Sequence, residues 1–517
     1  MRSNEVRTKL SWWTAGPIVL ALLTTACQSP VQRAAAPRLP ATQQAKLAEG
    51  REALFRGDRA TAARLFGEVV DSTGHPTAQL ALARLYLQGI DGARDPARAS
   101  ELLDAARGRR SPVQGQAAFE LAHLVANGDG VAADPERARA LYAEALDLGV
   151  AAAGVPLGIM RLKGEGGPVD LEGAQRALER AAADGNPWAM VRLAEARRAA
   201  GASEQQVAEI LWQGIAELER RALARHAGAA RELLRIDREQ VASVSPERKR
   251  TWLRYAADGG DVNATAALGF ALLPDDRSQG LAWLQRAAEA GQPSAQAEIG
   301  RRRLAGDGLE RDVAAGLMLL ENAAAAGSRH AMTVLATAYG RGDPLARDPE
   351  QARRWWQQAA ELGDKNATLQ LARLLVAEDA SATDRARGRA LLEQLAAEGD
   401  RDAMAQLGFA FQREDPAFAI AWFERAAEAG HAAAMAEIGR RKLTGDGLPA
   451  DPGRGLDLLK QASGQGSAWA MFLLGEAYAD GRGVPADAEL ARKWLAEGAA
   501  KGHQRAQARL AALEQRS

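Results

Sequence analysis

The residue types that most often carry catalysis or bind metal are sparse in this chain, and their spacing keeps them apart. Six histidines occur in 517 residues. Three of them directly follow a glycine at the same point of a repeated pattern and so lie whole repeats apart, namely His75, His431 and His503. The other three, His123, His226 and His330, show no metal-binding spacing such as His-Glu-x-x-His. The histidines therefore predict no metal site, no cofactor and no catalytic group.

Two Gly-Asp-Gly runs, at 306–308 and 445–447, invite a comparison with ion-binding loops. They lack the further Asp or Asn ligands of a calcium loop and the Gly-Lys-Ser/Thr of a phosphate-binding loop. Carboxylates are plentiful elsewhere, but no pair is singled out. We interpret the runs as turns that end helices, and we predict that the protein is not an enzyme.

Tryptophans recur at two fixed positions. Five lie eight residues before a recurring glycine: Trp252, Trp283, Trp355, Trp422 and Trp494. Because leucine takes this position in sister repeats, we predict that it belongs to the hydrophobic core; a row of sugar-stacking tryptophans is the alternative. Trp188 and Trp469 instead lie three residues after the glycine, near the start of a predicted helix, and are the candidate contacts for a partner.

The elements that position these residues follow from a regular series of glycines. Glycine occurs at 260, 291, 327, 363, 399, 430, 466 and 502, in steps of 31 or 36 residues. A shift of 139 residues brings the sequence onto itself, so that 297–302 and 436–441 both read Ala-Glu-Ile-Gly-Arg-Arg. A fixed period of this size is typical of repeat architectures.

One repeat, from Ser467 to Gly502, predicts two helices. Apolar residues at 470, 473, 474 and 477 line one helix face. Gly-Arg-Gly at 481–483 then breaks the helix, and a second helix begins near Asp487. Other repeats open it with Asp-Pro, which suits the N-cap and the first helical position. Since one hairpin cannot bury its apolar face alone, we predict an all-α protein, an α-solenoid of stacked helix-turn-helix repeats.

The repeat pattern resembles the Sel-1-like repeat, a relative of the tetratricopeptide repeat. The resemblance rests on Leu474, Gly475, Tyr478, Gly481, Gly483, Val484, Asp487, Ala491, Trp494 and Gly502. The 31-residue units depart from it, since a shorter turn replaces the Gly-x-Gly loop at 272–279 and 411–416. The resemblance implies an extended surface that binds other proteins.

The amino-terminal segment has the order of an export signal. Residues 1–26 begin with basic residues and continue into an apolar stretch too short for a typical membrane span. Leu23-Thr24-Thr25-Ala26-Cys27 resembles a bacterial lipobox, which implies a lipid on Cys27 as the mature N-terminus and, with Gln28 following, the outer membrane as its destination. Residues 27–44, with three prolines, read as a tether.

The rest of the chain divides into three parts. We predict tetratricopeptide and Sel-1-like repeats over 45–195, an irregular Arg-rich helical segment over 196–250, and further Sel-1-like repeats in tandem 139-residue blocks over 251–517. The middle segment is interpreted as a distorted repeat pair, a hinge or a partner site, with the first two favoured. Equal numbers of basic and acidic residues, 66 each, argue against nucleic-acid binding.

Two functions from different classes fit these observations. The order of lipobox, tether and repeats resembles the scaffold lipoproteins of alginate secretion. That resemblance implies a lipid-anchored periplasmic scaffold, whose partners are an outer-membrane pore and polysaccharide synthase components. The alternative is a regulator or binding module for cell-wall enzymes or for another envelope process.

Overall fold

The computed structural model describes residues 39–514 except 91, 378 and 379. Cys27, the predicted signal and most of the predicted tether lie outside the described residues. Within them the chain is all-α: 27 α-helices follow one another, and the single β-bridge joins Ile90 and Ala93. The contacts divide the chain into two compact units, residues 1–268 and 269–517, which are treated separately below.

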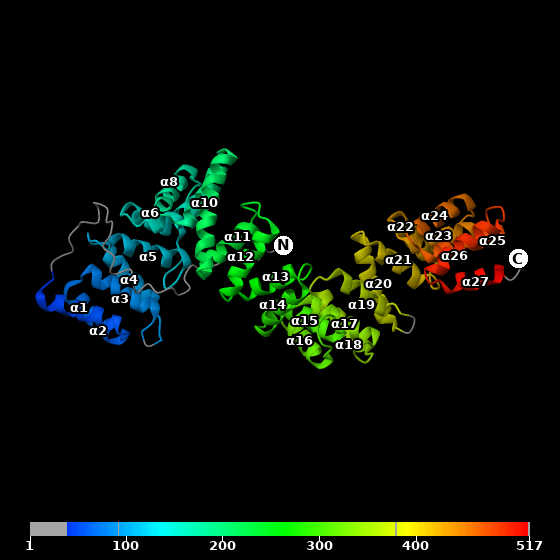
Figure 1. Cartoon of the computed structure of the whole chain (residues 1–517), viewed down its shortest axis with the longest axis horizontal. Helices are drawn as coiled ribbons and strands as arrows, with labels where there is room; N and C mark the ends of the chain where they lie inside the picture. The colour runs from blue at the N-terminus through cyan, green and yellow to red at the C-terminus, as the bar shows by residue number, and fades with distance from the viewer. Residues whose placement is uncertain (1–38, 91, 378–379, 515–517) are drawn as a thin grey trace. The chain divides into compact units, whose positions relative to one another are not determined.

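From residue 39 onward, the described part of the first unit contains twelve complete α-helices and one 3₁₀ turn, and the thirteenth helix runs across the unit's boundary (Figure 1). Their bounds are α1 (Ala41–Phe55), α2 (Arg59–Thr73), α3 (Pro76–Gln88), α4 (Pro96–Arg107), α5 (Gln114–Asn127), α6 (Pro135–Asp147), η3 (Ala151–Ala153), α7 (Gly154–Lys163), α8 (Leu171–Ala183), α9 (Pro187–Ala199), α10 (Glu204–Leu223), α11 (Ala227–Arg238), α12 (Pro246–Asp258) and α13 (Val262–Leu272).

The second unit continues the same alternation to the carboxyl end of the described chain. Its helices are α14 (Arg277–Glu289), α15 (Pro293–Ala305), α16 (Val313–Ala325), α17 (Arg329–Arg341), α18 (Pro349–Glu361), α19 (Lys365–Leu375), α20 (Ala382–Ala397), α21 (Arg401–Phe411), α22 (Pro416–Glu428), α23 (Ala432–Thr444), α24 (Pro452–Gly464), α25 (Ala468–Asp480), α26 (Ala488–Ala500) and α27 (Gln504–Glu514). Odd-numbered helices are the first helices of the repeats, and even-numbered helices are the second.

Helix boundaries follow from the residues at the caps. Gly481 ends α25 with φ +67°, a left-handed conformation that glycine adopts at low cost. The carboxylate of Asp487 then accepts hydrogen bonds from the backbone N–H groups of Glu489 and Leu490, both at 2.9 Å, and so satisfies two donors that an α-helix leaves open at its start. The predicted helix-loop-helix unit is confirmed.

Glycines also set how closely the helices pack. A Cβ atom added at Gly408 in α21 would lie 2.5 Å from the ring of Phe423 in α22, so only glycine lets the two helices of this hairpin approach so closely. The second glycine of each Gly-x-Gly loop packs in a similar way on the preceding repeat: a Cβ at Gly166 would lie 2.2 Å from the carbonyl oxygen of Pro135, at the start of α6. Each such loop therefore fixes its hairpin against the one before it.

Five tryptophans lie at the predicted core position, eight residues before a recurring glycine, and four of them are only half-buried. The prediction that Trp283 and Trp422 are core residues was therefore wrong. The residue after each of them fills the core instead: Leu284 and Phe423 are fully buried. Arginines cover the tryptophan rings, with the guanidinium carbon of Arg425 at 4.2 Å from the ring centre of Trp422. Trp252 is the exception and is fully buried. The sugar-stacking alternative stays a prediction.

The predicted irregular segment 196–250 continues the order of hairpins. Its distinctive feature is the length of α10, which has 20 residues where most other helices have 11 to 15. Glu219 in α10 accepts a hydrogen bond from Nε1 of Trp252 at 2.6 Å and pairs with Arg248 at 2.7 Å, so α10 and α12 are tied together. The guanidinium group of Arg248 also lies over the ring of Trp212, at 4.6 Å.

Candidate interaction surface

Charged side chains link the first helices of consecutive repeats. Glu476 of α25 pairs with Arg509 of α27 at 2.7 Å. In the first unit, Arg84 of α3 pairs with Glu120 of α5 at 2.6 Å, and the Glu120 side chain is only 5% exposed. Counted from the glycine that precedes each first helix, Glu476 is at position 10 and Arg509 at position 7. Position 10 of one first helix therefore lies beside position 7 of the next.

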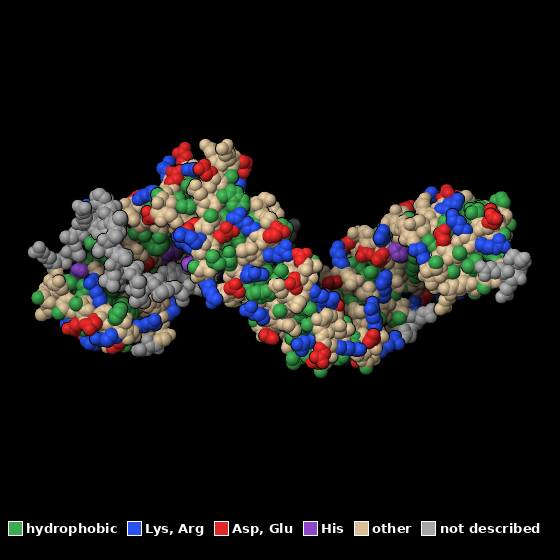
Figure 2. All heavy atoms as spheres, in the orientation of Figure 1, with side chains coloured by type: hydrophobic (Ala, Val, Ile, Leu, Met, Phe, Trp, Pro, Cys, Tyr) green, Lys and Arg blue, Asp and Glu red, His purple; other side chains and the backbone are tan. Residues whose placement is uncertain are grey.

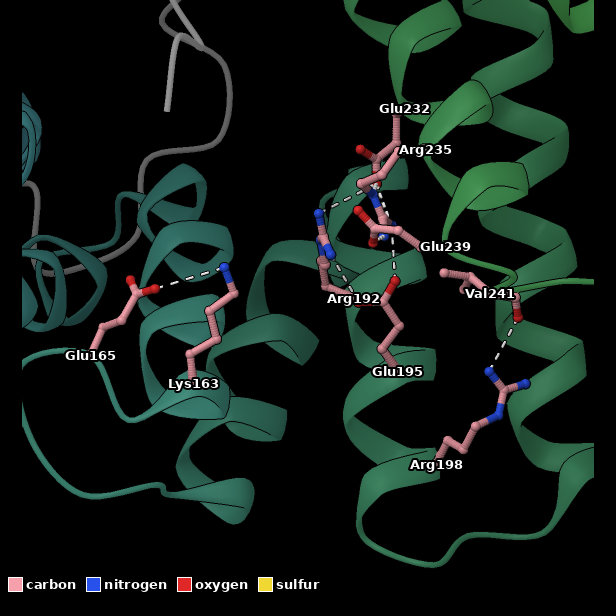
Figure 3. A network of polar contacts seen from close by, with 9 residues as sticks. All are labelled: Lys163, Glu165, Arg192, Glu195, Arg198, Glu232, Arg235, Glu239 and Val241. Carbon is pink, nitrogen blue, oxygen red and sulfur yellow. Dashed lines mark hydrogen bonds and ion pairs between the residues drawn. The ribbon is translucent and has the colours of Figure 1, made fainter. Parts of the chain in front are cut away.

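The most extensive of these links joins α9 to α11 (Figure 3). Arg235 of α11 donates to Glu232 at 2.8 Å, to Glu239 at 2.5 Å and, across the repeat boundary, to Glu195 of α9 at 2.9 Å. Burial alone disfavours the charged guanidinium group of Arg235, but the hydrogen bonds to these carboxylates outweigh it and raise its pKa. Arg192 completes the network through Glu195, at 2.9 Å.

Two weaker links appear beside this network in Figure 3. Arg198 at the end of α9 donates to the carbonyl oxygen of Val241 at 3.2 Å, and Lys163 lies 3.7 Å from Glu165 in the loop after α7. Both are exposed, so we assign the electrostatic stabilisation of this region to the buried Arg235 network.

The Gly-Asp-Gly runs carry their own ion pairs. Asp446 lies 2.9 Å from Arg440, which also pairs with Glu437 at 2.7 Å; the hydrogen bond from Arg440 lowers the pKa of Asp446. Asp307 is held in the same way by Arg301 and Arg302, and it also pairs with Arg277. Gly306 and Gly445 adopt left-handed φ angles at the ends of α15 and α23. These carboxylates therefore hold helix ends in place, in keeping with their interpretation as turns.

The two candidate partner contacts, Trp188 and Trp469, occupy matching places between repeats. Each is half-buried, and its ring lies 5.6 Å from the histidine that caps the next first helix: His226 for Trp188 and His503 for Trp469. Nδ1 of His503 accepts the backbone N–H of Ala506 at 3.1 Å. Both tryptophans thus stabilise a repeat junction, and whether either also contacts a partner stays a prediction.

His123 is the most strongly perturbed histidine. Its Nδ1 lies 2.9 Å from the hydroxyl of Tyr142, and its ring lies edge-on to Phe119, with centroids 4.7 Å apart. Burial lowers the pKa of His123 to about 4. The ring is therefore neutral near pH 7, and it lies half-buried against Phe119 and Tyr142 at the edge of the first unit's core.

This burial predicts a pH dependence of stability. In the unfolded chain His123 takes up a proton near its ordinary pKa of about 6.5, whereas the folded ring does so only near 4. Because the unfolded state binds the proton more readily, His123 lowers stability as pH falls from about 6.5 towards 4, with no contribution above that range. We expect urea midpoints to fall less between pH 7.5 and 5 in His123→Gln than in the wild type. The exposed His330→Gln is the control, and an unchanged pH dependence in His123→Gln would contradict the assignment.

Metal ligands and a pocket are the remaining candidates for chemistry among the described residues. No three His, Cys, Asp or Glu side chains gather among them in an arrangement suited to a metal ion, and no helix among them is long and apolar enough to cross a membrane. A pocket of about 480 Å³ lies beside the turn between α1 and α2 and includes Gly57, Asp58 and Gly89. Asp58 already accepts the backbone N–H of Thr61 at 3.0 Å as the N-cap of α2, so its carboxylate has a structural role.

Comparison with known proteins places these repeats in a family. Nine segments match the Sel1 repeat, and together they make up more than half of the chain: 76–106, 115–150, 157–186, 268–292, 293–328, 329–364, 402–431, 432–467 and 470–503. The chain belongs to the Sel1 repeat family. No curated protein matches it.

Solved structures with this fold include two bacterial Sel1-type proteins. The chain is 23% identical to c5321, a protective antigen of uropathogenic Escherichia coli strains, over 88% of this chain and 91% of that one, with a TM-score of 0.62. It is 24% identical to a Sel1 repeat protein from Oxalobacter formigenes, over 46% of this chain and 99% of that one, with a TM-score of 0.40. The Sel1 repeats and the likeness to c5321 confirm the predicted α-solenoid class, and repeats of this kind suit protein–protein interaction.

Proposed function

We propose that this protein is a non-catalytic scaffold, anchored by a lipid on Cys27 to the periplasmic face of the outer membrane. It brings together a pore and the synthase components of an exopolysaccharide secretion complex of the alginate type. The structural observation that supports the scaffold is the uninterrupted stacking of hairpins in each unit, which presents a broad surface of first helices. In the first unit the buried charged groups on those helices, Glu120, Glu232 and Arg235, form ion pairs between repeats, so they hold the surface in shape.

The anchor and the destination rest on the sequence before residue 39. A basic start, an apolar stretch and small residues precede Cys27, and Gln28 follows it. Near-neutral charge gives no strong attraction to an anionic polymer, so the scaffold acts through protein contacts and has no need to hold the polymer.

Deletion of the gene tests the proposal, with the wild-type gene and a Cys27→Ser variant supplied in trans. We expect deletion to stop polymer secretion and to lower the amount of pore in the outer membrane. Cys27→Ser should leave an unprocessed precursor that takes up no radiolabelled palmitate and restores secretion poorly. Intact secretion and pore level after deletion would refute the secretion role. Palmitate labelling of Cys27→Ser would refute the anchor alone.

A further inference from the structure

We propose that the turn between α1 and α2 rests on the phospholipid surface, with the ring of Phe55 among the lipids. The occupant of this exposed apolar surface is the bilayer to which the lipid on Cys27 holds the chain. The contact depends on the proposed anchor, and it gives the first hairpin a fixed orientation at the membrane.

Phe55 is the last residue of α1 and is 82% exposed. No other phenylalanine or tryptophan of the described chain is more than 38% exposed. The packing of this helix end is supplied by its neighbours, since Ala53 is fully buried and Leu54 packs against the core of the first unit. The fold therefore leaves a phenyl ring outside the core, and transfer of that ring from water into an apolar layer is favourable.

The turn that follows Phe55 is open on its outer side. Gly57 has φ +83°, and a Cβ atom added there would meet no atom within 4 Å. The carboxylate of Asp58 is engaged as the N-cap of α2, where it accepts the backbone N–H of Thr61 at 3.0 Å. A flat surface such as a bilayer can therefore approach the turn without a clash at Gly57.

The charges around Phe55 are close to balance. Residues 51–59 contain three arginines and two acidic residues, and the neighbouring loop, 89–95, adds one basic and two acidic residues. Arg56 lies 3.2 Å from Glu52, and both side chains are more than 60% exposed. Long arginine side chains can hold their charge at the lipid phosphates while an adjacent ring enters the apolar layer. The contact therefore depends on the ring and requires no excess of charge.

The chain between Cys27 and α1 has the length that this orientation needs. With its 15 residues, α1 is about 22 Å long, so its first residue lies about that far from the bilayer when Phe55 touches it. The 12 residues from Gln28 to Leu39 span about 19 Å as a flexible coil and about 37 Å when fully extended as polyproline II. The lipid and Phe55 can thus lie in the same bilayer.

The lipid makes even a weak second contact effective. Because the anchor already holds the hairpin near the bilayer, entry of the ring is an intramolecular step with a high effective concentration. Burial of one phenyl ring favours the inserted orientation by about ten- to a hundredfold. Phe55 thus sets the orientation of the hairpin, and the lipid supplies the attachment.

Site-specific fluorescence tests the contact on the lipidated full chain in vesicles of phosphatidylethanolamine and phosphatidylglycerol. Cys27 is the single cysteine, and its thiol is taken up by the lipid, so Phe55→Cys provides one site for a fluorophore. The matched control is Leu223→Cys at the end of α10, where the residue is 68% exposed. We expect phospholipids with a nitroxide on the acyl chain to quench the label at 55 more than twofold and to leave the label at 223 unchanged. No quenching at 55, or equal quenching at both positions, would overturn the proposal.

Phe55→Ser provides a second measurement, since an exposed ring can be removed without loss of the fold. We expect an unchanged urea midpoint and unchanged palmitate labelling, but faster tryptic cleavage after Arg56 on vesicles than in the wild type. Protection of Arg56 in cell envelopes but not on vesicles would assign Phe55 to a protein partner and so contradict the lipid contact. A wild-type chain without palmitate would refute the anchor and the contact together, whereas an unquenched label at 55 on a palmitoylated chain would refute the contact alone.

Discussion

Arg235→Ala is expected to lower the free energy of unfolding of the first unit by about 3–5 kcal/mol, because it removes the nearer counter-charge of the buried Glu232 carboxylate and leaves only Arg192, 3.9 Å away. The Arg235 side chain is 10% exposed, and that of Glu232, its partner at 2.8 Å, is 4% exposed. The same substitution also removes the link from α11 to Glu195 in α9. Urea denaturation followed by circular dichroism gives the measurement.

A matched exposed pair provides the control for this experiment. Arg176 and Glu172 lie 3.4 Å apart on α8 with side chains 68% and 88% exposed, so Arg176→Ala should change stability by less than about 1 kcal/mol. A double variant, Glu232→Gln with Arg235→Met, should recover much of the loss because it leaves no buried charge unpaired: Glu195 keeps Arg192, and Glu239, which loses Arg235, is 48% exposed. If Arg235→Ala behaved like Arg176→Ala, the network would contribute little to stability.

Phe423→Ala is the second substitution with a large expected effect, also about 3–5 kcal/mol, since it removes a fully buried ring and leaves a cavity between α21 and α22. Its neighbour Trp422 is half-buried beneath Arg425, so Trp422→Ala should cost only about 1–2 kcal/mol. Thermal denaturation of both variants compares the stability lost at the buried Phe423 with that lost at Trp422, whose ring Arg425 covers. A greater loss in Trp422→Ala would reverse the assignment.

The helices and loops could be predicted because their signals are local. Asp487 caps α26 and Gly481 ends α25 through contacts within a few residues, so the sequence alone specifies both. The burial of Trp422 was misjudged for a different reason. Tryptophan and leucine replace each other at this position, so the position is apolar. That exchange does not distinguish the centre of a helix's apolar face, which is buried, from its edge, which is partly exposed.

Contacts between first helices were beyond sequence reasoning. The pairing of Glu476 with Arg509 depends on the register of two stacked hairpins, which no single-repeat pattern reveals. The sequence does show opposite charges at fixed distances after the glycines of consecutive repeats, which could have indicated the pairing. Charges with the same spacing also occur on solvated helix faces, so they do not identify a contact.

The glycine contacts between neighbouring hairpins have a consequence for how the array comes apart. Stability in such arrays is roughly a sum of terms within repeats and terms between nearest neighbours. In the second unit a Cβ at Gly483 would lie 2.6 Å from Cβ of Pro452, so the glycine packs directly on the proline ring of the preceding repeat and couples those two repeats. The repeat of α21 and α22 has no Gly-x-Gly loop, and Arg385 and Glu414, 2.5 Å apart, link it to α20 through flexible side chains. Because such side chains can yield where a glycine backbone contact cannot, we expect α25 and α26 to open together with α23 and α24 in amide hydrogen exchange, whereas α21 and α22 depend for their coupling to α20 on the shared hydrophobic core.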